Sequence, residues 1–280
     1  MNEIKLTRRT FAATSLVAGF TLAAGPLRAG AIITDANGLV AGEVRLPVSD
    51  GAIPAYRARP ATGAHWPVVL VTQEIFGIHE HIKDICRRFA KQGYYAVAPS
   101  LYARYGDPAN YTDIKKLVAD IVSKVPDAEV MSDLDASARF AASEGADAGR
   151  LAIIGFCWGG RIVWMYAAHN PALKAAAAFY GALRAPAQRS PLRPLYPLEL
   201  VAKIDAPVIG FYGGKDEGIP VSDIEAMRAA LAQAGKRSDE INVYMDAGHG
   251  FLADYRPSYN EADAKVAWSK TLAWFRQHGV

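Results

Sequence analysis

Apolar runs alternate with amphipathic segments along most of this 280-residue chain. Short, mainly apolar runs predict buried strands at Trp66–Thr72, Tyr94–Ala98, Leu151–Ile154, Ala175–Phe179, Val208–Tyr212 and Glu240–Met245. Helices are predicted at His79–Gln92, Pro126–Ser143, Arg161–His169, Ser222–Ala234 and Glu261–His278. Strands that are apolar throughout are typical of a parallel sheet, because helices cover both of its faces. The pattern therefore predicts an α/β fold with a mostly parallel central sheet and helices on both faces.

A different pattern precedes this alternation. Gly42–Pro47 and Ile53–Ala58 alternate apolar and polar positions around Ser49-Asp50-Gly51, which predicts a β-hairpin. In a parallel sheet, active sites form at the carboxyl ends of the strands. Catalytic residues are therefore expected directly after the apolar runs.

The first 31 residues differ in composition from the rest. Thr7-Arg8-Arg9-Thr10-Phe11 precedes an apolar segment, Ala12 to Ala24, and the small residues Ala29-Gly30-Ala31. This order is typical of a twin-arginine export signal, and the apolar segment is too short to span a membrane. We therefore expect residues 1–31 to be read by the twin-arginine export machinery. Residues 32–280 are then expected to form a single domain that is periplasmic or secreted.

Charge and motifs exclude several classes of partner. The formal net charge of +3 arises within residues 1–31, so the remaining chain is nearly neutral and predicts neither nucleic-acid nor membrane binding. No G-x-G-x-x-G pattern follows a strand, so no dinucleotide cofactor is expected. His79 and His81 have no second cluster that completes a tetrahedral set, so no metal is expected either.

The segment Gly155-Phe156-Cys157-Trp158-Gly159-Gly160 lies between a predicted strand and a predicted helix. It has the form of the G-x-S-x-G nucleophile elbow, with cysteine in place of serine. The second cysteine, Cys86, falls on the apolar face of a predicted helix, so we expect two free thiols and no disulfide. Cys157 is therefore the candidate nucleophile.

Two more strand ends supply a candidate acid and base. Gly213-Gly214-Lys215-Asp216 follows one strand, and Gly248-His249-Gly250-Phe251 lies just after the next. The chain order nucleophile, acid, base is the order of α/β-hydrolases, in which the imidazole is the general base and the carboxylate fixes its tautomer. Competing acids are Glu217, Asp246 and Asp205, but the two glycines before Asp216 permit a sharp turn toward the site.

A carboxylate also lies where the oxyanion site is expected. Gln73-Glu74-Ile75-Phe76-Gly77 follows an apolar strand, at the place where this fold supplies one oxyanion N–H; the other comes from the residue after the nucleophile, Trp158. Glu74 would repel a developing oxyanion unless it is paired or protonated. Arg104, in Pro99-Ser100-Leu101-Tyr102-Ala103-Arg104, is a candidate partner; alternatively, the two are separate surface charges.

These five motifs, in this order and spacing, resemble the dienelactone hydrolase (carboxymethylenebutenolidase) family, which has the α/β-hydrolase fold. The resemblance implies a Cys157–Asp216–His249 triad that hydrolyses a small ester or lactone through a thioester acyl-enzyme. It also implies that an arginine holds Glu74 away from a neutral thiol until substrate releases this carboxylate to take the thiol proton. The backbone N–H groups of Ile75 and Trp158 would hold the oxyanion.

The resemblance further implies that Arg104 binds a substrate carboxylate. The family's second active-site arginine, four residues after the histidine, is replaced here by Ala253, and Arg256 is the candidate substitute. A broad-specificity carboxylesterase or thioesterase is the alternative activity, and a non-catalytic binding protein on the same fold is a third possibility. The expected partner is a small ester or lactone; the sequence predicts no oligomeric state.

The segment Ala182–Leu198 is longer than a strand-to-helix connection needs to be. It contains Arg184, Arg189, Arg193 and several prolines. One interpretation is a lid that brings positive charge to the site entrance; the other is a rigid surface loop.

Overall fold

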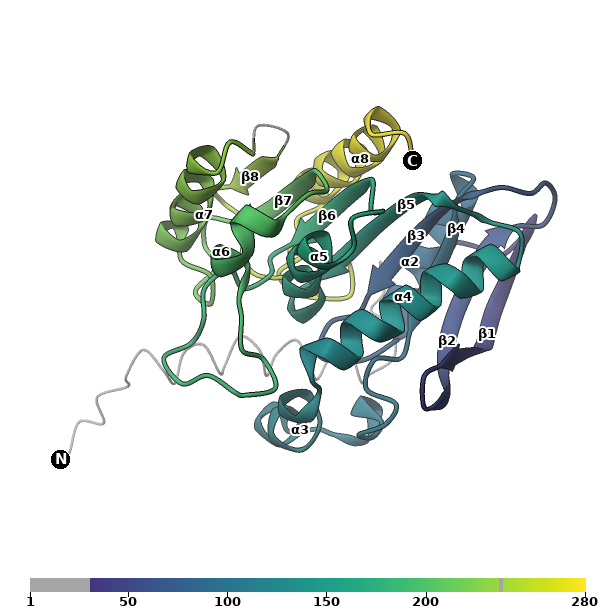
Figure 1. Cartoon of the computed structure of the whole chain (residues 1–280), viewed down its shortest axis with the longest axis horizontal. Helices are drawn as coiled ribbons and strands as arrows, with labels where there is room; N and C mark the ends of the chain where they lie inside the picture. Colours follow the sequence, from purple (N-terminus) through teal and green to yellow (C-terminus); the bar gives the residue numbers. More distant parts are fainter. Residues whose placement is uncertain (1–30, 237–238) are drawn as a thin grey trace.

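The computed structural model describes residues 31–236 and 239–280, so nearly all of the predicted export signal lies outside the described residues. Within these ranges, no helix has the length and apolar composition needed to cross a membrane. The described chain folds around one sheet (Figure 1).

The sheet has eight strands in the spatial order β1-β2-β4-β3-β5-β6-β7-β8. Their bounds are β1 Leu39–Val48, β2 Gly51–Pro60, β3 Pro67–Thr72, β4 Tyr95–Pro99, β5 Asp147–Phe156, β6 Ala175–Phe179, β7 Val208–Gly213 and β8 Glu240–Tyr244. β1 and β2 form the predicted hairpin, and β2 runs antiparallel to β4. Every other pairing is parallel, for example Leu70 of β3 beside Ile153 of β5. The prediction of a mostly parallel sheet is confirmed.

Helices lie on both faces of the sheet (Figure 1). Their bounds are α2 Glu80–Lys91, α3 Ile114–Asp120, α4 Asp127–Ser143, α5 Trp158–His169, α6 Pro197–Leu200, α7 Val221–Gln233 and α8 Glu261–Gln277. On one face, the α2 residue Phe89 packs 4.7 Å from the α8 residue Trp268, measured between ring centroids. On the other, α5 meets α4 through a hydrogen bond from Tyr166 to Asp135.

The hydrophobic pattern does not predict α3, α6 or the 3-10 turns Pro108–Asn110, Val122–Lys124 and Val201–Lys203. Local hydrogen bonds start the two short helices. The Asp113 carboxylate accepts hydrogen bonds from the amides of Lys115 and Lys116 at the start of α3, and Glu199 accepts one from the Tyr196 amide at α6. Capping of this kind can define an element too short to show a hydrophobic period.

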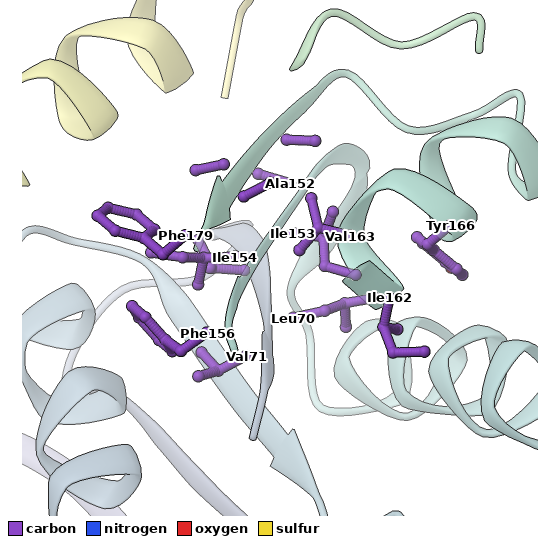
Figure 2. Packing of buried hydrophobic residues seen from close by; sticks show 14 of the residues in the cluster. Leu70, Val71, Ala152, Ile153, Ile154, Phe156, Ile162, Val163, Tyr166 and Phe179 are labelled. Atoms are coloured by element: carbon purple, nitrogen blue, oxygen red, sulfur yellow. The ribbon is translucent and has the colours of Figure 1, made fainter. Parts of the chain in front are cut away.

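The core between the sheet and α5 holds the turn that contains Cys157. Figure 2 shows Leu70 and Ile153 of the strands near Ile162 and Val163 of α5, and all four are fully buried. Burial of such side chains contributes roughly 1.5–3 kcal/mol each. This packing fixes the end of β5 relative to the start of α5. Both cysteines of the chain are free thiols, as predicted.

Candidate active site

Cys157 occupies the sharp turn between β5 and α5. Its φ of 56° lies in the left-handed region, which costs a non-glycine residue about 1–3 kcal/mol. Its amide donates to the Phe179 carbonyl at 3.0 Å, and its carbonyl accepts from the Gly160 amide at 3.0 Å. A Cβ atom at Gly159 would lie 2.5 Å from the Gln73 carbonyl oxygen, so this position requires glycine. The turn has the geometry of a nucleophile elbow.

His249 and Asp216 are brought together by the loops after β8 and β7. The distance from Nδ1 of His249 to Oδ2 of Asp216 is 2.7 Å. The other Asp216 oxygen accepts hydrogen bonds from the amides of Gly218 at 2.8 Å and Ile219 at 3.2 Å. Because three groups fix the carboxylate, it can hold the imidazole in one orientation, with Nδ1 protonated and Nε2 left as the base.

The other candidate acids lie elsewhere. Asp246 is 86% exposed and pairs with Lys215, whereas Asp205 is 69% exposed and lies 3.8 Å from Lys236. Glu217 is exposed. Asp216 is thus the carboxylate in contact with His249.

Electrostatics at His249 favour its charged form. Burial alone lowers the pKa of the imidazole, but the thiolate form of Cys157 and the Asp216 carboxylate outweigh burial and raise this pKa to about 10. Nε2 of His249 is buried and has no hydrogen-bond partner of normal geometry among the described residues. Hydrogen bonding with the Cys157 side chain also contributes to the raised pKa, so the imidazole and the thiol are neighbours. The imidazole becomes a strong proton acceptor when the neighbouring thiol is ionised.

Glu74 is completely buried just after β3. Its Oε1 atom accepts a hydrogen bond from Nη2 of Arg256 at 2.9 Å, and its Oε2 atom accepts one from the Tyr255 hydroxyl. Nε2 of His79 lies 3.4 Å from Oε2. Three side chains thus surround one carboxylate, and the sequence did not predict Tyr255 or His79 as partners of Glu74. The sequence signal that could have indicated Tyr255 is its position directly before the candidate Arg256.

These contacts stabilise the negative charge of Glu74. Burial by itself raises the pKa of Glu74, but Arg256, His79 and Tyr255 together hold it well below its usual value. Arg256 is itself buried, and its guanidinium lies 5.2 Å from the ring centre of Phe76 and 5.5 Å from that of Tyr255. Glu74 is therefore an ionised carboxylate whose basicity is suppressed by its partners.

Arg104 does not pair with Glu74. Its guanidinium contacts both oxygens of Asp50 and both oxygens of Asp133, and Glu129 lies 3.5 Å away. The resemblance gave Arg104 to a substrate carboxylate, but here three carboxylates already surround it. Arg104 instead lines a cavity of about 690 Å³ that Phe76 and His79 also line and that the triad residues do not.

Two backbone amides near the nucleophile have no acceptor within the described part of the chain. Trp158 is the first residue of α5, so its N–H has no partner within the helix, and no other described group accepts from it. The amide of Ile75, next to Glu74, also donates to no described group. Free N–H groups at the start of a helix favour negative charge. Both amides are therefore available to an oxyanion.

Uncharged polar groups complete the surroundings of Cys157. The Tyr102 and Trp158 rings are in edge contact, with centroids 5.0 Å apart, and the Tyr180 ring centre lies 5.1 Å from that of His249. Among the residues that the structure describes, the hydroxyls of both tyrosines, Nε1 of Trp158 and both amide atoms of Gln73 are buried without a hydrogen-bond partner of normal geometry. Buried polar groups are normally satisfied, so this cluster indicates a place for a ligand or water. Gln73 and Tyr102 lie within two of the five motifs, but no role was predicted for them, and Tyr180 lies in none of these motifs.

The segment Ala182–Leu198 is tied to the body of the protein. The Asp127 amide donates to the Leu192 carbonyl at 3.0 Å, and the Arg161 guanidinium donates to the Leu195 carbonyl at 2.7 Å. Arg161 also binds the two oxygens of Asp127 at 2.8 and 2.6 Å. These contacts favour the rigid-loop interpretation over the lid.

His79 and His81 do not face a common point. Their rings stack at 6.1 Å, but His79 lies against Glu74 and His81 against Asp254, at 3.2 Å. In the described ranges, no group of three or more His, Cys, Asp or Glu side chains is placed to hold a metal ion.

Comparison with known proteins places this geometry in a family. The family model of the dienelactone hydrolase family matches residues 53–279. The chain belongs to the dienelactone hydrolase family. A protein of Methylorubrum extorquens, provisionally named a carboxymethylenebutenolidase, is 57% identical over 280 residues, which cover 99% of this chain and 95% of that protein. A protein of Escherichia coli with the same provisional name is 50% identical over 268 residues, covering 95% and 98%.

Solved structures agree with this family assignment. A crystal structure from Klebsiella pneumoniae, described provisionally as a dienelactone hydrolase, superposes with a TM-score of 0.83 at 52% identity, covering 85% of this chain and 99% of that one. A dienelactone hydrolase-like promiscuous phosphotriesterase from metagenomic libraries superposes with a TM-score of 0.71 at 20% identity, a similarity of fold alone. This chain thus has the α/β-hydrolase fold of a hydrolase family.

Proposed function

We propose that this protein hydrolyses a small ester or lactone through a covalent thioester on Cys157. The observation that carries the proposal is the elbow at Cys157, with its φ of 56°, in the electrostatic reach of a His249 that Asp216 orients at 2.7 Å. A strained thiol and an oriented imidazole are the two parts that nucleophilic catalysis needs.

In the proposed first step, substrate binding displaces Glu74 from Arg256. Without this cation, burial dominates and raises the pKa of Glu74, so the carboxylate can accept the thiol proton. The thiolate attacks the ester carbonyl, and the amides of Ile75 and Trp158 stabilise the oxyanion. The C–O bond then breaks, and the alcohol leaves with the proton that Glu74 took from the thiol.

In the proposed second step, His249 removes a proton from water as that water attacks the thioester. Asp216 stabilises the imidazolium that forms, and Cys157 leaves as a thiolate. The carboxylic acid product departs, and the proton on His249 returns to the Cys157 thiolate. A thiol that is ionised only with substrate bound is less open to oxidation, which suits an exported enzyme.

The runner-up activity is broad-specificity hydrolysis of neutral carboxylic esters or thioesters. The engagement of Arg104 with Asp50 and Asp133 favours it over recognition of dienelactone by Arg104. Comparing kcat/KM for a carboxylate-bearing lactone with that for a neutral ester, in wild type and Arg104→Ala, separates the two. A larger loss of kcat/KM for the lactone than for the neutral ester in Arg104→Ala would show that Arg104 binds the substrate carboxylate.

The decisive experiment uses 4-nitrophenyl acetate in stopped flow. Wild type should give a burst of nitrophenolate equal to the concentration of active enzyme, and Cys157→Ala should give neither burst nor turnover. Full activity in Cys157→Ala would overturn the nucleophile assignment. A folded wild type that turns over none of a panel of esters and lactones would favour a binding protein instead.

We also propose that residues 1–31 direct export through the twin-arginine machinery, on the basis of Arg8, Arg9 and the apolar segment that follows. Cell fractionation tests this proposal. Wild type should reach the periplasm or medium, and the Arg8→Lys/Arg9→Lys variant should stay in the cytoplasm; equal export of both would contradict it.

A further inference from the structure

Arg256, the cation that pairs with Glu74, lies in a segment of turns and irregular backbone, residues 251–260. Backbone hydrogen bonds join residues of this segment to one another: the Ala253 amide donates to the Gly250 carbonyl and the Arg256 amide to the Ala253 carbonyl, both at 2.9 Å. Buried apolar side chains hold the segment in the core, but apolar packing is not directional. A hydrogen bond to another element is therefore needed to fix the direction of this segment.

Asp254 supplies hydrogen bonds of this kind. Its Oδ2 atom accepts from Nη2 of Arg88 at 2.5 Å, and its Oδ1 atom lies 3.2 Å from Nδ1 of His81; both partners belong to α2. The Asp254 side chain is 2% exposed. Burial alone raises the pKa of Asp254, but His81 and Arg88 outweigh burial and hold this pKa below its usual value. Asp254 is therefore an ionised carboxylate bound to α2 at two points, which we call the Asp254 anchor.

The α2 side of the anchor is itself fixed. Nε of Arg88 donates to Oδ2 of Asp84 at 2.5 Å, one turn earlier in the helix. Asp84 is buried, and its Oδ1 atom accepts from the Thr34 amide at 2.6 Å and from Arg87 at 3.2 Å. A buried network of paired charges restricts the positions of its members. Arg88 is therefore a rigid partner for Asp254.

The start of α2 also reaches Glu74. Nε2 of His79, the N-cap residue of α2, lies 3.4 Å from Oε2 of Glu74. The ring centre of Tyr255 lies 4.9 Å from that of His79 and 5.3 Å from that of His81. One helix and its cap thus contact both the buried carboxylate and the segment that carries the partners of this carboxylate.

We propose that Asp254 is a positioning residue whose contacts with α2 hold Arg256 against Glu74, so that the resting thiol stays neutral. This inference rests on the proposed role of Glu74 as acceptor of the thiol proton. Because the segment of Arg256 is anchored, Glu74 is the member of the ion pair that moves when substrate binds. Loss of the anchor should weaken the ion pair, raise the pKa of Glu74 and increase the fraction of thiolate before substrate arrives.

The test measures how fast iodoacetamide alkylates Cys157 at pH 7 without substrate, since the thiolate is the reactive form. In Asp254→Asn this rate should rise at least about fivefold, because the uncharged amide no longer forms the ion pair with α2. The matched control is Glu144→Gln, which should stay within twofold of wild type. Glu144 also binds an arginine and a phenol, Arg57 at 2.9 Å and Tyr95 at 2.6 Å, but Tyr95 begins β4, at the opposite edge of the sheet from the site.

A double variant separates positioning from a general loosening of the fold. Loosening would expose Cys157 whether or not residue 74 can accept its proton. We therefore expect Asp254→Asn/Glu74→Gln to be alkylated within twofold of the rate of Glu74→Gln. No rise in Asp254→Asn, or an equal-fold rise with and without the Glu74 carboxylate, would overturn the proposal.

Arg88→Gln tests the same anchor from α2 and decides the question if Asp254→Asn does not fold. It should give the same Glu74-dependent rise, and an alkylation rate within twofold of wild type would refute the anchor. Alkylation needs no turnover, so the two proposals can fail separately. A Glu74-dependent rise in a protein that hydrolyses no ester would refute only the reaction, whereas ester hydrolysis with unchanged alkylation in these variants would refute only the anchor.

Discussion

Two buried carboxylates near Cys157 have opposite surroundings. Asp216 contacts the imidazole of His249, which lies on the loop after β8, and two backbone amides of its own loop. Glu74 contacts a guanidinium and a phenol from a segment about 180 residues away along the chain. The first arrangement orients a base, whereas the second suppresses one. The comparison teaches that a carboxylate's role at this site is set by its partners and by whether substrate can remove them.

Neutralising either carboxylate should cause the largest loss of activity. Asp216→Asn should lower kcat on the order of 10³- to 10⁴-fold, because an amide no longer holds the imidazole in the required tautomer. Glu74→Gln should lower it by about 10²- to 10⁴-fold, the usual contribution of a general base. Steady-state kinetics with 4-nitrophenyl acetate measures both. Activity within twofold of wild type in either variant would remove that residue from the mechanism.

Removing the cation beside Glu74 should have the next largest effect. Arg256→Met leaves a buried, unpaired carboxylate and should lower the free energy of unfolding by about 3–5 kcal/mol, measured by urea denaturation at pH 7. The double variant Glu74→Gln/Arg256→Met is the matched control. Because it has no unpaired charge, it should recover much of the loss. A double variant as unstable as Arg256→Met would show that packing, not charge, explains the effect.

The same pair predicts a dependence of stability on pH. The pKa of Glu74 is lowered from an ordinary value of 4.5, so its stabilising contribution is complete above about pH 4.5 and is lost as pH falls further toward the folded-state pKa. Glu74→Gln should therefore lose less stability than wild type between pH 5 and acid unfolding. Parallel pH profiles of the two proteins would contradict this assignment.

A smaller effect should come from the phenol that contacts Glu74. Tyr255→Phe removes one hydrogen bond to a charged group and should cost about 1.5–3 kcal/mol in urea denaturation. Tyr259→Phe, which removes a hydroxyl with no hydrogen bond among the described residues, should cost less than about 0.5 kcal/mol. Tyr255→Phe should also raise the rate at which iodoacetamide alkylates resting Cys157, because Glu74 becomes more basic. An unchanged alkylation rate would mean that Tyr255 has no influence on the thiol.

The smallest effect should come from the surface acid that competed with Asp216 in the sequence. Asp246 is 86% exposed and pairs with Lys215, so Asp246→Asn should change stability by less than about 1 kcal/mol. It should leave kcat/KM within twofold of wild type. A loss comparable to that of Asp216→Asn would exchange the roles of the two acids.

Much of the fold could be predicted because burial leaves a local signature. Strands such as Ala175–Phe179 are apolar at every position, and the glycines around Cys157 mark a turn too tight for side chains. The contact between Asp216 and His249 was predictable in outline, since both follow strands whose carboxyl ends share one edge. Periodicity and strand order carry this information.

The partners of the charged residues were not predictable. Arg104 and Arg256 are both plausible partners for Glu74 in the sequence, but only Arg256 reaches it. The choice depends on where Asp50 and Asp133 lie, since they occupy Arg104. An ion pair depends on a distance of a few ångströms between residues that can be far apart in the chain. No local sequence pattern predicts that distance.

The most direct test of the different roles of the two carboxylates is the intact mass of each variant shortly after mixing with 4-nitrophenyl acetate, followed by peptide mapping. Asp216→Asn should accumulate one acetyl group on Cys157, because acylation proceeds while hydrolysis of the thioester stalls. Glu74→Gln should remain unmodified over the same time, because the thiol keeps its proton. Equal acetylation of the two variants, or an acetyl group on a residue other than Cys157, would contradict the account.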